Sequence, residues 1–277
     1  MRIAVTGSTG CIGSHVVNDL IQDGHEVVSI VRNIDNFHLI SNKHTVVNIE
    51  IGKEDGHVFE SLGRPDVLLD LAWENLDNYM SLLHVEKTLV EHYNFIKQLV
   101  ESGLKSVVVT GTCFEYGLQY GALSESMQTM PTNPYGYAKD SLRKQLELLR
   151  SEIGFNMTWL RLFYIYGNEK CKGIYSQLIE SIKRGDVGFN MSKGEQIRDY
   201  ISINDLSKSI ANITALNRSY GVVNICDGNP ISVRSIVESW VSEYHSDIEL
   251  NLGFYKYPEY ESLCFWGDNS KMKSILE

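Results

Sequence analysis

The stretch IAVTGSTGCIG, residues 3–13, decides the fold. It begins with a short apolar, β-branched run, and residues 14–24 follow with apolar side chains at the spacing of an amphipathic helix. Between them, Gly7 permits a tight turn, Gly10 lets backbone amides approach a ligand, and Gly13 lets the helix lie close to the sheet. A strand, a glycine loop and a helix in this order predict a site for the diphosphate of a dinucleotide at the helix N-terminus.

The residues at the end of the next expected strand indicate which dinucleotide is bound. Residues 25–31 form that strand and are followed by Arg32 and Asn33, at the place where a site for NAD carries an acidic residue for the ribose 2′-hydroxyl. Arg32 is suited to pair bidentately with a 2′-phosphate, and Asn33 to add a hydrogen bond. We therefore expect NADP(H) as the favoured cofactor and NAD(H) as the alternative. The cofactor residues expected from these two segments are Gly7, Thr9, Gly10, Cys11, Ile12, Gly13, Arg32 and Asn33.

The same rhythm of strand and helix continues along the chain. Nearly continuous apolar runs, typical of parallel strands buried on both faces, occur at 3–7, 25–31, 45–51, 66–72, 106–111 and 157–167. Segments of helical period separate them, including a long one from about Tyr79 to Ser102. The pattern predicts an α/β fold with a Rossmann-type doubly wound parallel sheet.

After Gly167 the pattern changes to shorter elements. Helices are expected at about 173–184, from Asp205 and at 232–245, and strands near Val187, at 200–204 and at 221–227. We divide the chain into an NAD(P)-binding domain, residues 1–166, and a smaller C-terminal α+β substrate lobe, residues 167–277, interleaved with the first. A ligand cleft is expected between them.

Composition and hydrophobic patterning indicate which classes of partner and which cellular location to expect. The chain has 277 residues and a formal net charge of -10, which argues against nucleic acid as the main partner because phosphate backbones are bound by basic patches. The first strand begins too early for a cleavable signal region, and no apolar run approaches the roughly 18 residues that span a bilayer. We expect a cytoplasmic protein that does not bind membranes.

Cysteine and histidine spacing gives no sign of a metal. The cysteines are Cys11, Cys113, Cys171, Cys226 and Cys264, and they form no C-x-x-C pair. We expect all five to be reduced thiols. The eight histidines are dispersed without an H-E-x-x-H spacing, so no metal site is expected.

A candidate catalytic set lies in the middle of the chain. Tyr135 and Lys139 are four residues apart in a helical segment, so both side chains share one face and the ammonium can stabilise a tyrosinate. The run at 106–111 continues into Gly-Thr-Cys, which places Thr110 and Thr112 at the carboxyl edge of the sheet, where ligands bind in open α/β sheets. Thr112 is expected to hydrogen-bond a substrate carbonyl and hold it against Tyr135.

In order along the chain, several motifs resemble those of the extended short-chain dehydrogenase/reductases that modify nucleotide sugars. The resemblance covers nearly the whole chain. The motifs are TGSTGCIG (6–13), LAW (71–73), GTCFEYG (111–117), NPYGYAK (133–139), RLFYIYG (161–167), IRDYISINDL (197–206) and DNSKMKSIL (268–276).

This resemblance implies roles for individual residues. Tyr135 would be the acid/base, Lys139 would lower its pKa and contact the nicotinamide ribose, and Thr112 would orient the carbonyl. The implied cofactor contacts also include Leu71, Ala72, Thr110, Tyr135 and Lys139, and the implied substrate contacts are Trp73, Thr112, Tyr135, Tyr164 and Arg198. Thr112 replaces the family's usual serine, and Tyr164 replaces an asparagine that often touches the sugar diphosphate. A homodimer formed through the long helices is also implied.

The residues after Thr112 indicate which reactions of this family the chain lacks the groups to catalyse. Dehydratases of this family carry Asp-Glu there, whereas this chain has Cys113 and Phe114, so dehydration lacks its acid/base pair. Enzymes that invert C3 and C5 resemble one another in a cysteine at the position of Phe114 and a downstream histidine, and no histidine occurs here between His92 and His245.

What remains is chemistry at C4. With Arg32 at the ribose, we expect NADPH-dependent reduction of the C4 carbonyl of a nucleotide-linked 4-keto-6-deoxyhexose in deoxysugar biosynthesis. A nucleotide-sugar 4-epimerase with tightly held NAD is the alternative, and a non-catalytic NADP(H)-binding partner protein is the third reading. The pattern leaves the nucleobase, the sugar and the stereochemistry at C4 open.

Overall fold

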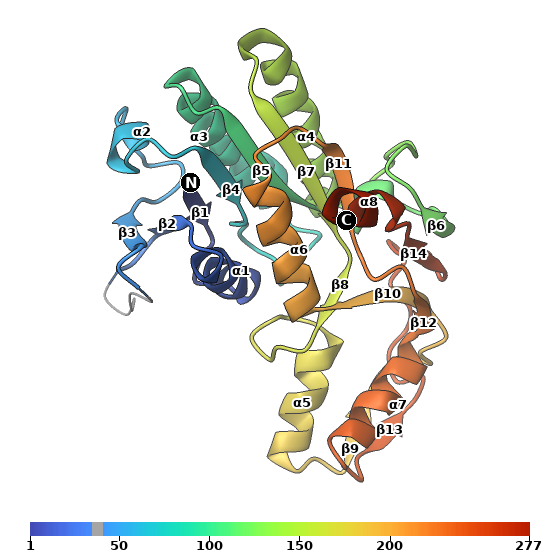
Figure 1. Ribbon diagram of the computed structural model, residues 1–277. Coiled ribbons are helices and arrows are strands. Elements are labelled where there is room, and N and C mark those ends of the chain that lie inside the picture. The colour runs from blue at the N-terminus through green and yellow to red at the C-terminus, as the bar shows by residue number, and fades with distance from the viewer. Residues whose placement is uncertain (35–40) are drawn as a thin grey trace.

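A computed structural model describes residues 1–34 and 41–277 and contains a seven-stranded sheet in the order β11-β7-β5-β4-β1-β2-β3 (Figure 1). All the pairings in this sheet are parallel, which confirms the expected doubly wound fold. The strand order reverses between β1 and β4, so a crevice opens there at the carboxyl edge. The strands are β1 (Arg2–Thr6), β2 (Glu26–Val31), β3 (His44–Asn48), β4 (Val67–Asp70), β5 (Ser106–Thr112), β7 (Asn156–Leu162) and β11 (Gly221–Ile225).

Helices cover both faces of the sheet because neighbouring residues of each buried strand point to opposite sides. Val107 and Val109 of β5 pack in the core that includes α3 (Leu89–Glu101) and α4 (Pro134–Ile153). Val108 packs on the other face, in the core with α1 (Cys11–Gln22), α6 (Ile203–Ala215) and α8 (Ser270–Leu276). The remaining short helices of the larger body are α2 (Val58–Ser61), the π-helical turn η1 (His84–Thr88) and the 3-10 turn η2 (Cys113–Tyr116).

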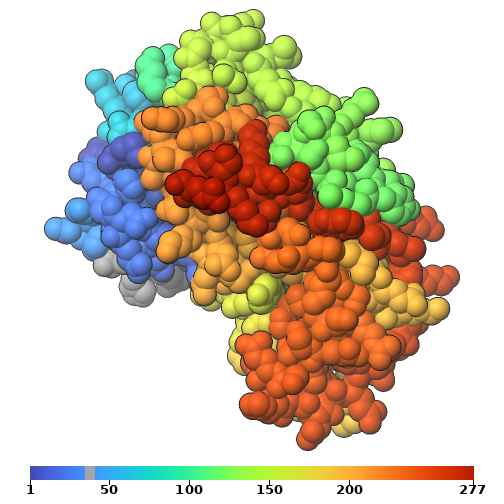
Figure 2. All heavy atoms as spheres, turned by 45° about the vertical axis from the view of Figure 1, so that its right-hand side comes forward, coloured from blue at the N-terminus to red at the C-terminus, as the bar shows by residue number. Residues whose placement is uncertain are grey.

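The smaller lobe lies beside the carboxyl edge of the sheet (Figure 1) and projects from the body (Figure 2). Its core joins α5 to α7 through Leu178, Trp240 and Tyr175. A three-stranded sheet in the order β12-β10-β8 links it to the body. The elements are β8 (Tyr164–Tyr166), α5 (Ile174–Arg184), β9 (Gly188–Asn190), β10 (Ile197–Ser202), β12 (Pro230–Ser232), α7 (Val233–Glu243) and β13 (Glu249–Asn251), and β6 (Gly121–Leu123) pairs with β14 (Phe265–Gly267) nearby.

Two element boundaries differ from expectation. The single strand expected at 157–167 is two strands. The Phe163 side chain packs in a separate buried cluster, and β8 after it pairs with β10 rather than with the main sheet. The helix expected from about Tyr79 begins only at η1, and the carbonyl of Tyr79 accepts instead from the N–H of Tyr135.

The two parts of the chain share the main sheet. Strand β11 comes from beyond residue 166 and pairs with β7, while α6 and α8 also pack on the body. The division at residue 166 therefore remains a proposal, with β11 as an interleaved element. Among the described residues, no helix is both long enough and apolar enough to cross a membrane.

Candidate functional site

The glycine loop turns sharply between β1 and α1. Gly7 has a φ of 63°, and a Cβ there would lie 2.8 Å from the backbone nitrogen of Ala72. A Cβ at Gly13 would overlap the carbonyl of Gly7, so the helix can approach the loop this closely only with glycine at that position. Helix α1 begins at Cys11 after an extended Gly10 that provides no side-chain cap. Its first N–H groups therefore face outward, as a diphosphate requires.

A buried hydrogen-bond network fixes the strand ends beneath this loop. The hydroxyl of Thr6 donates to Asp70 (2.5 Å) and accepts from the N–H groups of Leu71 and Ala72. His92 Nδ1 donates to the other carboxylate oxygen of Asp70 over 2.7 Å. Burial favours the neutral acid, but His92, the charge of Lys139 and the hydrogen bond from Thr6 together outweigh it and lower the pKa of Asp70. Asp70 is not among the site residues expected from the sequence, although a carboxylate at the end of an apolar strand is a usable signal.

Nine of the expected cofactor residues line a cavity of about 310 Å³ beside the loop. They are Gly7, Thr9, Gly10, Cys11, Ile12, Gly13, Arg32, Leu71 and Ala72, while Asn33 does not line it. At its outer end Arg32 Nη1 lies 2.6 Å from Glu74 Oε1, and Lys87 Nζ lies 3.0 Å from Glu74 Oε2. The hydrogen bond from Lys87 lowers the pKa of Glu74, so this carboxylate is charged at neutral pH. Arg32 therefore already has an anionic partner.

A second cavity, of about 640 Å³, adjoins the first and reaches the smaller lobe. The structure brings the three expected catalytic residues to it from β5 and α4. Those of the expected site residues that line it are Cys11, Ile12, Arg32, Leu71, Trp73, Thr110, Thr112, Tyr135, Lys139 and Tyr164. Arg198 does not line it.

Thr112 is held by a capping arrangement at the end of β5. Its hydroxyl accepts from the N–H of Phe114, and its own N–H donates to Glu115 Oε1 over 2.9 Å. Glu115 is fully buried and also accepts from Trp159 Nε1 and, over 2.7 Å, from Arg161 Nε. The spacing Thr-x-x-Glu is a signal for this cap. The sequence analysis placed neither Glu115 nor Arg161 in such a role.

Lys139 is buried beneath the cavity. Its Nζ donates to the carbonyl of Thr110 over 2.8 Å and lies 3.8 Å from the centroid of the Trp73 ring. Burial lowers the pKa of Lys139 to about 8, against the opposing charges of Asp70 and Glu115. The ammonium form is therefore dominant at neutral pH but lies close to its titration.

Tyr135 differs from the expectation that Lys139 lowers its pKa. The ring stacks on Tyr79 with centroids 5.2 Å apart, and burial followed by the Tyr79 interaction raises the pKa, while the hydroxyl of Thr112 opposes the rise. Burial, as the largest cause, thus sets the direction of the shift in the resting site, where the ammonium of Lys139 donates to Thr110 and contacts Trp73. Tyr135 is thus protonated at neutral pH, which suits a proton donor.

Trp73 is positioned by a neutral histidine. Its indole Nε1 donates to His84 Nδ1 over 3.1 Å, and His84 Nε2 donates to the carbonyl of Asn78 over 3.0 Å. Burial lowers the pKa of His84, which favours this neutral form. The chain of hydrogen bonds fixes the indole over Lys139, and the sequence analysis missed it.

Arg198 and Tyr164, the residues expected near the substrate phosphates, are both held within the smaller-lobe side of the site. Arg198 is 2% exposed, donates to Glu261 over 2.8 Å and stacks on Phe265. Tyr164 faces the cavity, and its buried hydroxyl has no hydrogen-bond partner among the described residues. Tyr164 thus borders the cavity with its ring, whereas Arg198 is engaged with Glu261.

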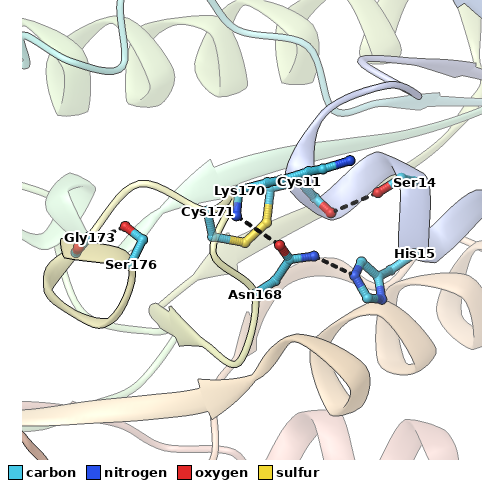
Figure 3. Close-up of a disulfide and its surroundings, with 8 residues drawn as sticks. All are labelled: Cys11, Ser14, His15, Asn168, Lys170, Cys171, Gly173 and Ser176. Atoms are coloured by element: carbon cyan, nitrogen blue, oxygen red, sulfur yellow. Dashed lines mark hydrogen bonds between the residues drawn. A yellow bond between two sulfur atoms is a disulfide. The ribbon is translucent and has the colours of Figure 1, made fainter. Parts of the chain in front are cut away.

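The expectation of five reduced thiols is wrong for two of them, because Cys11 and Cys171 form a disulfide (Figure 3). They are separated by 160 positions, so only the folded chain shows that the loop after β8 returns to the start of α1. Cys113, Cys226 and Cys264 are free. Within residues 1–34 and 41–277, no group of three or more histidines, cysteines or carboxylates is arranged to hold a metal ion.

Comparison with known proteins adds a family and several relatives. The model of the NAD dependent epimerase/dehydratase family matches residues 3–226. The chain is 28% identical over 270 residues to the dTDP-6-deoxy-L-talose 4-dehydrogenase (NAD(+)) of Aggregatibacter actinomycetemcomitans, covering 96% of this chain and 99% of that protein. It is also 25% identical to a UDP-glucose 4-epimerase of Halalkalibacterium halodurans, over 86% of this chain and 79% of that one.

Solved structures share the fold. MoeE5 in complex with UDP-glucose and NAD superimposes with a TM-score of 0.85 at 22% identity, covering 100% of this chain and 92% of the other. The UDP-glucuronic acid 4-epimerase of Bacillus cereus, in complex with UDP-glucuronic acid and NAD, gives a TM-score of 0.84 at 23% identity, covering 100% and 93%.

Proposed function

Because this chain belongs to the NAD dependent epimerase/dehydratase family and is an NAD(P)-dependent nucleotide-sugar oxidoreductase or epimerase, we propose that it reduces the C4 carbonyl of a nucleotide-linked 4-keto-6-deoxyhexose. The observation that carries this proposal is a protonated Tyr135 beside Thr112 and Lys139 in one cavity, with Cys113 and Phe114 following Thr112. The name of the relative in A. actinomycetemcomitans supports it.

The catalytic residues divide the reduction between them. A bound reduced nicotinamide supplies hydride to C4. Thr112 donates a hydrogen bond to the carbonyl oxygen, and Tyr135 gives its proton to that oxygen as the hydroxyl forms. The ammonium of Lys139 then stabilises the tyrosinate until it is reprotonated from solvent. A positioned proton transfer of this kind contributes about 10²–10⁴ in rate.

Other reactions of the family lack their groups in this cavity. Elimination of water needs a carboxyl pair after Thr112. Burial raises the pKa of the Cys113 thiol, so it stays protonated and cannot accept a proton as a base. The carboxylate next in line, Glu115, is committed to Arg161 and faces away from the cavity.

For the cofactor we propose NAD(H), with NADP(H) as the alternative. Arg32 favours NADP(H) when the sequence is considered alone. Its ion pair with Glu74 opposes that preference, because a 2′-phosphate beside Arg32 would also meet the charged carboxylate. The relative in A. actinomycetemcomitans carries NAD(+) in its name, which supports the same choice.

A 4-epimerase with tightly held NAD is the second candidate. The relative in H. halodurans and the B. cereus structure are both 4-epimerases by name, and the hydroxyl, tyrosine and lysine set serves either reaction. Incubation with dTDP- and GDP-4-keto-6-deoxyhexoses, each made in place by a 4,6-dehydratase, separates the two. Loss of added NADH absorbance that depends on substrate supports the reductase. An isomerised sugar nucleotide without loss of added NADH supports the epimerase.

We also propose a cytoplasmic homodimer formed through α3 and α4. Val90, Tyr137 and Leu148 on these helices are large apolar side chains with 49%, 54% and 71% exposure, which supports an interface there. The proposed partners are this second copy and the nucleotide sugar, without nucleic acid or membrane.

A further inference from the structure

The disulfide joins the start of α1 to the loop between β8 and α5 (Figure 3). Cys11 is the first residue of α1, in the glycine loop, and Cys171 lies in the loop between β8 and α5. Their Cα atoms are 5.1 Å apart, within the usual range for a disulfide. A second link lies one turn along α1, where Asn168 Nδ2 donates to His15 Nε2 over 2.7 Å.

The disulfide lies at a point that a bound dinucleotide would have to pass. Cys11 lines both cavities, and Cys171 lines the larger one, so the bond lies where the two cavities meet. The loop that carries Cys171 continues directly into α5 of the smaller lobe. A covalent bond there ties the lobe to the glycine loop. A dinucleotide that extends from one cavity into the other must enter and leave past this tie.

We propose that Cys11 and Cys171 form a redox-controlled latch on the cofactor cleft. The disulfide holds the cleft closed and slows dinucleotide exchange, and reduction to two thiols frees the loop and permits fast exchange. This inference rests on the cofactor placement made under the proposed function. Disulfides in cytoplasmic proteins are usually transient or redox-sensing rather than structural, which agrees with a switch.

The redox step is balanced by a small disulfide. Oxidation removes one proton from each thiol and two electrons from the pair, forms the bond between Cys11 and Cys171, and leaves the small disulfide as two thiols. A dithiol reverses the step by thiolate attack.

The environment of this pair differs from that of the other thiols. A helix N-terminus and neighbouring lysines favour the reactive thiolate, and Cys11 begins α1 while exposed Lys170 and Lys172 flank Cys171. Cys171 is buried like Cys113 and Cys226, whose pKa burial raises, so the helix N-terminus at Cys11 and the lysines beside Cys171 are what distinguish the pair.

The test measures release of NADH rather than turnover. The whole protein is oxidised with a small disulfide or reduced with a dithiol, and thiol titration after denaturation should find three free thiols in the first sample and five in the second. Each sample is loaded with NADH and mixed with excess NAD in a stopped-flow fluorimeter. The release rate constant is expected to be about tenfold higher in the reduced protein.

Variants assign the effect to the pair. Cys171→Ser should release NADH at the fast rate under both conditions, and Cys264→Ser, which removes a free thiol, should respond to redox state like the natural chain. Equal rates for the oxidised and reduced natural chain, which needs no substitution to fold, would overturn the latch and leave the reductase proposal intact. A redox response retained by Cys171→Ser would overturn it too. Absence of NADH binding in both states would instead reject the cofactor placement, and the latch with it.

Discussion

Tyr135 carries the proton in this account, and its removal is the first prediction at the scale of residues. Tyr135→Phe keeps the stacking on Tyr79 but removes the proton donor, so kcat for ketosugar reduction should fall by about 10²–10⁴. NADH affinity, measured by fluorescence titration, should stay within about twofold because the ring is retained. Tyr120→Phe, at an exposed tyrosine outside both cavities, is the matched control and should leave kcat unchanged. Undiminished turnover in Tyr135→Phe would refute the assignment.

The pKa of Lys139 predicts how kcat/KM for reduction depends on pH. Its charged form stabilises the tyrosinate, and burial lowers its pKa to about 8. As the pH rises through 8 the ammonium loses its proton, so kcat/KM for reduction should decline above that pH and be constant just below it. Initial rates at saturating NADH across this range provide the measurement. A profile that stays flat well above pH 8 would show that the charge of Lys139 is not needed.

Glu74 predicts the cofactor preference. Glu74→Gln removes the carboxylate beside Arg32, so the ratio of kcat/KM for NADPH over NADH should rise by about tenfold, or about 1.4 kcal/mol. Arg32→Ala should lower the same ratio. Glu101→Gln, an exposed acid at the end of α3, is the control and should not change it. If Glu74→Gln leaves the ratio unaltered, the ion pair does not set the preference.

At the scale of elements, the buried ion pair behind β5 holds Thr112 in place. Glu115→Ala leaves the buried guanidinium of Arg161 unpaired, so the free energy of unfolding should fall by about 3–5 kcal/mol in urea titrations. The exposed pair of Arg234 and Glu238 is the comparison, and Glu238→Ala should cost about 1 kcal/mol or less. A similar loss of unfolding free energy in both variants would mean that the buried ion pair stabilises the fold no more than an exposed one.

Elements with a local signal were predicted from the sequence. The glycine loop carries its turn, its close approach and its helix start within a few residues, and Gly7, Gly10 and Gly13 all lie where that pattern indicates. The continuous run at 157–167 misled because apolar residues continue across Phe163, and only packing against a distant cluster shows that the chain changes sheets there. Hydrophobic periodicity does not report such a change.

Part of the site depends on contacts that periodicity cannot show. The sequence placed Thr112, Tyr135 and Lys139 together, and the structure gathers all three at one cavity. The partner of Arg32 could not be predicted, because Glu74 lies 42 positions away and meets it only across the sheet edge. The raised pKa of Tyr135 could not be predicted from the sequence either, because it results from burial and from Tyr79, which comes from another segment of the chain.

At the scale of the whole molecule, a parallel sheet places the glycine loop and the catalytic residues at one edge, and the smaller lobe borders the same cavities. The disulfide ties that lobe to the glycine loop. The arrangement gives one cleft in which the proposed function places the dinucleotide beside Tyr135 and the sugar nucleotide on the lobe side.

The most direct test of the central claim follows the hydride. The chain is incubated with NADH that carries deuterium at C4 of the nicotinamide, in separate samples for each face, and with a nucleotide-linked 4-keto-6-deoxyhexose. We predict that one of the two samples yields a sugar nucleotide with deuterium at C4 of the hexose, in amounts equal to the NADH consumed, as measured by mass spectrometry and NMR. A product without deuterium at C4 in both samples, formed while added NADH is untouched, would contradict the reductase and support the epimerase.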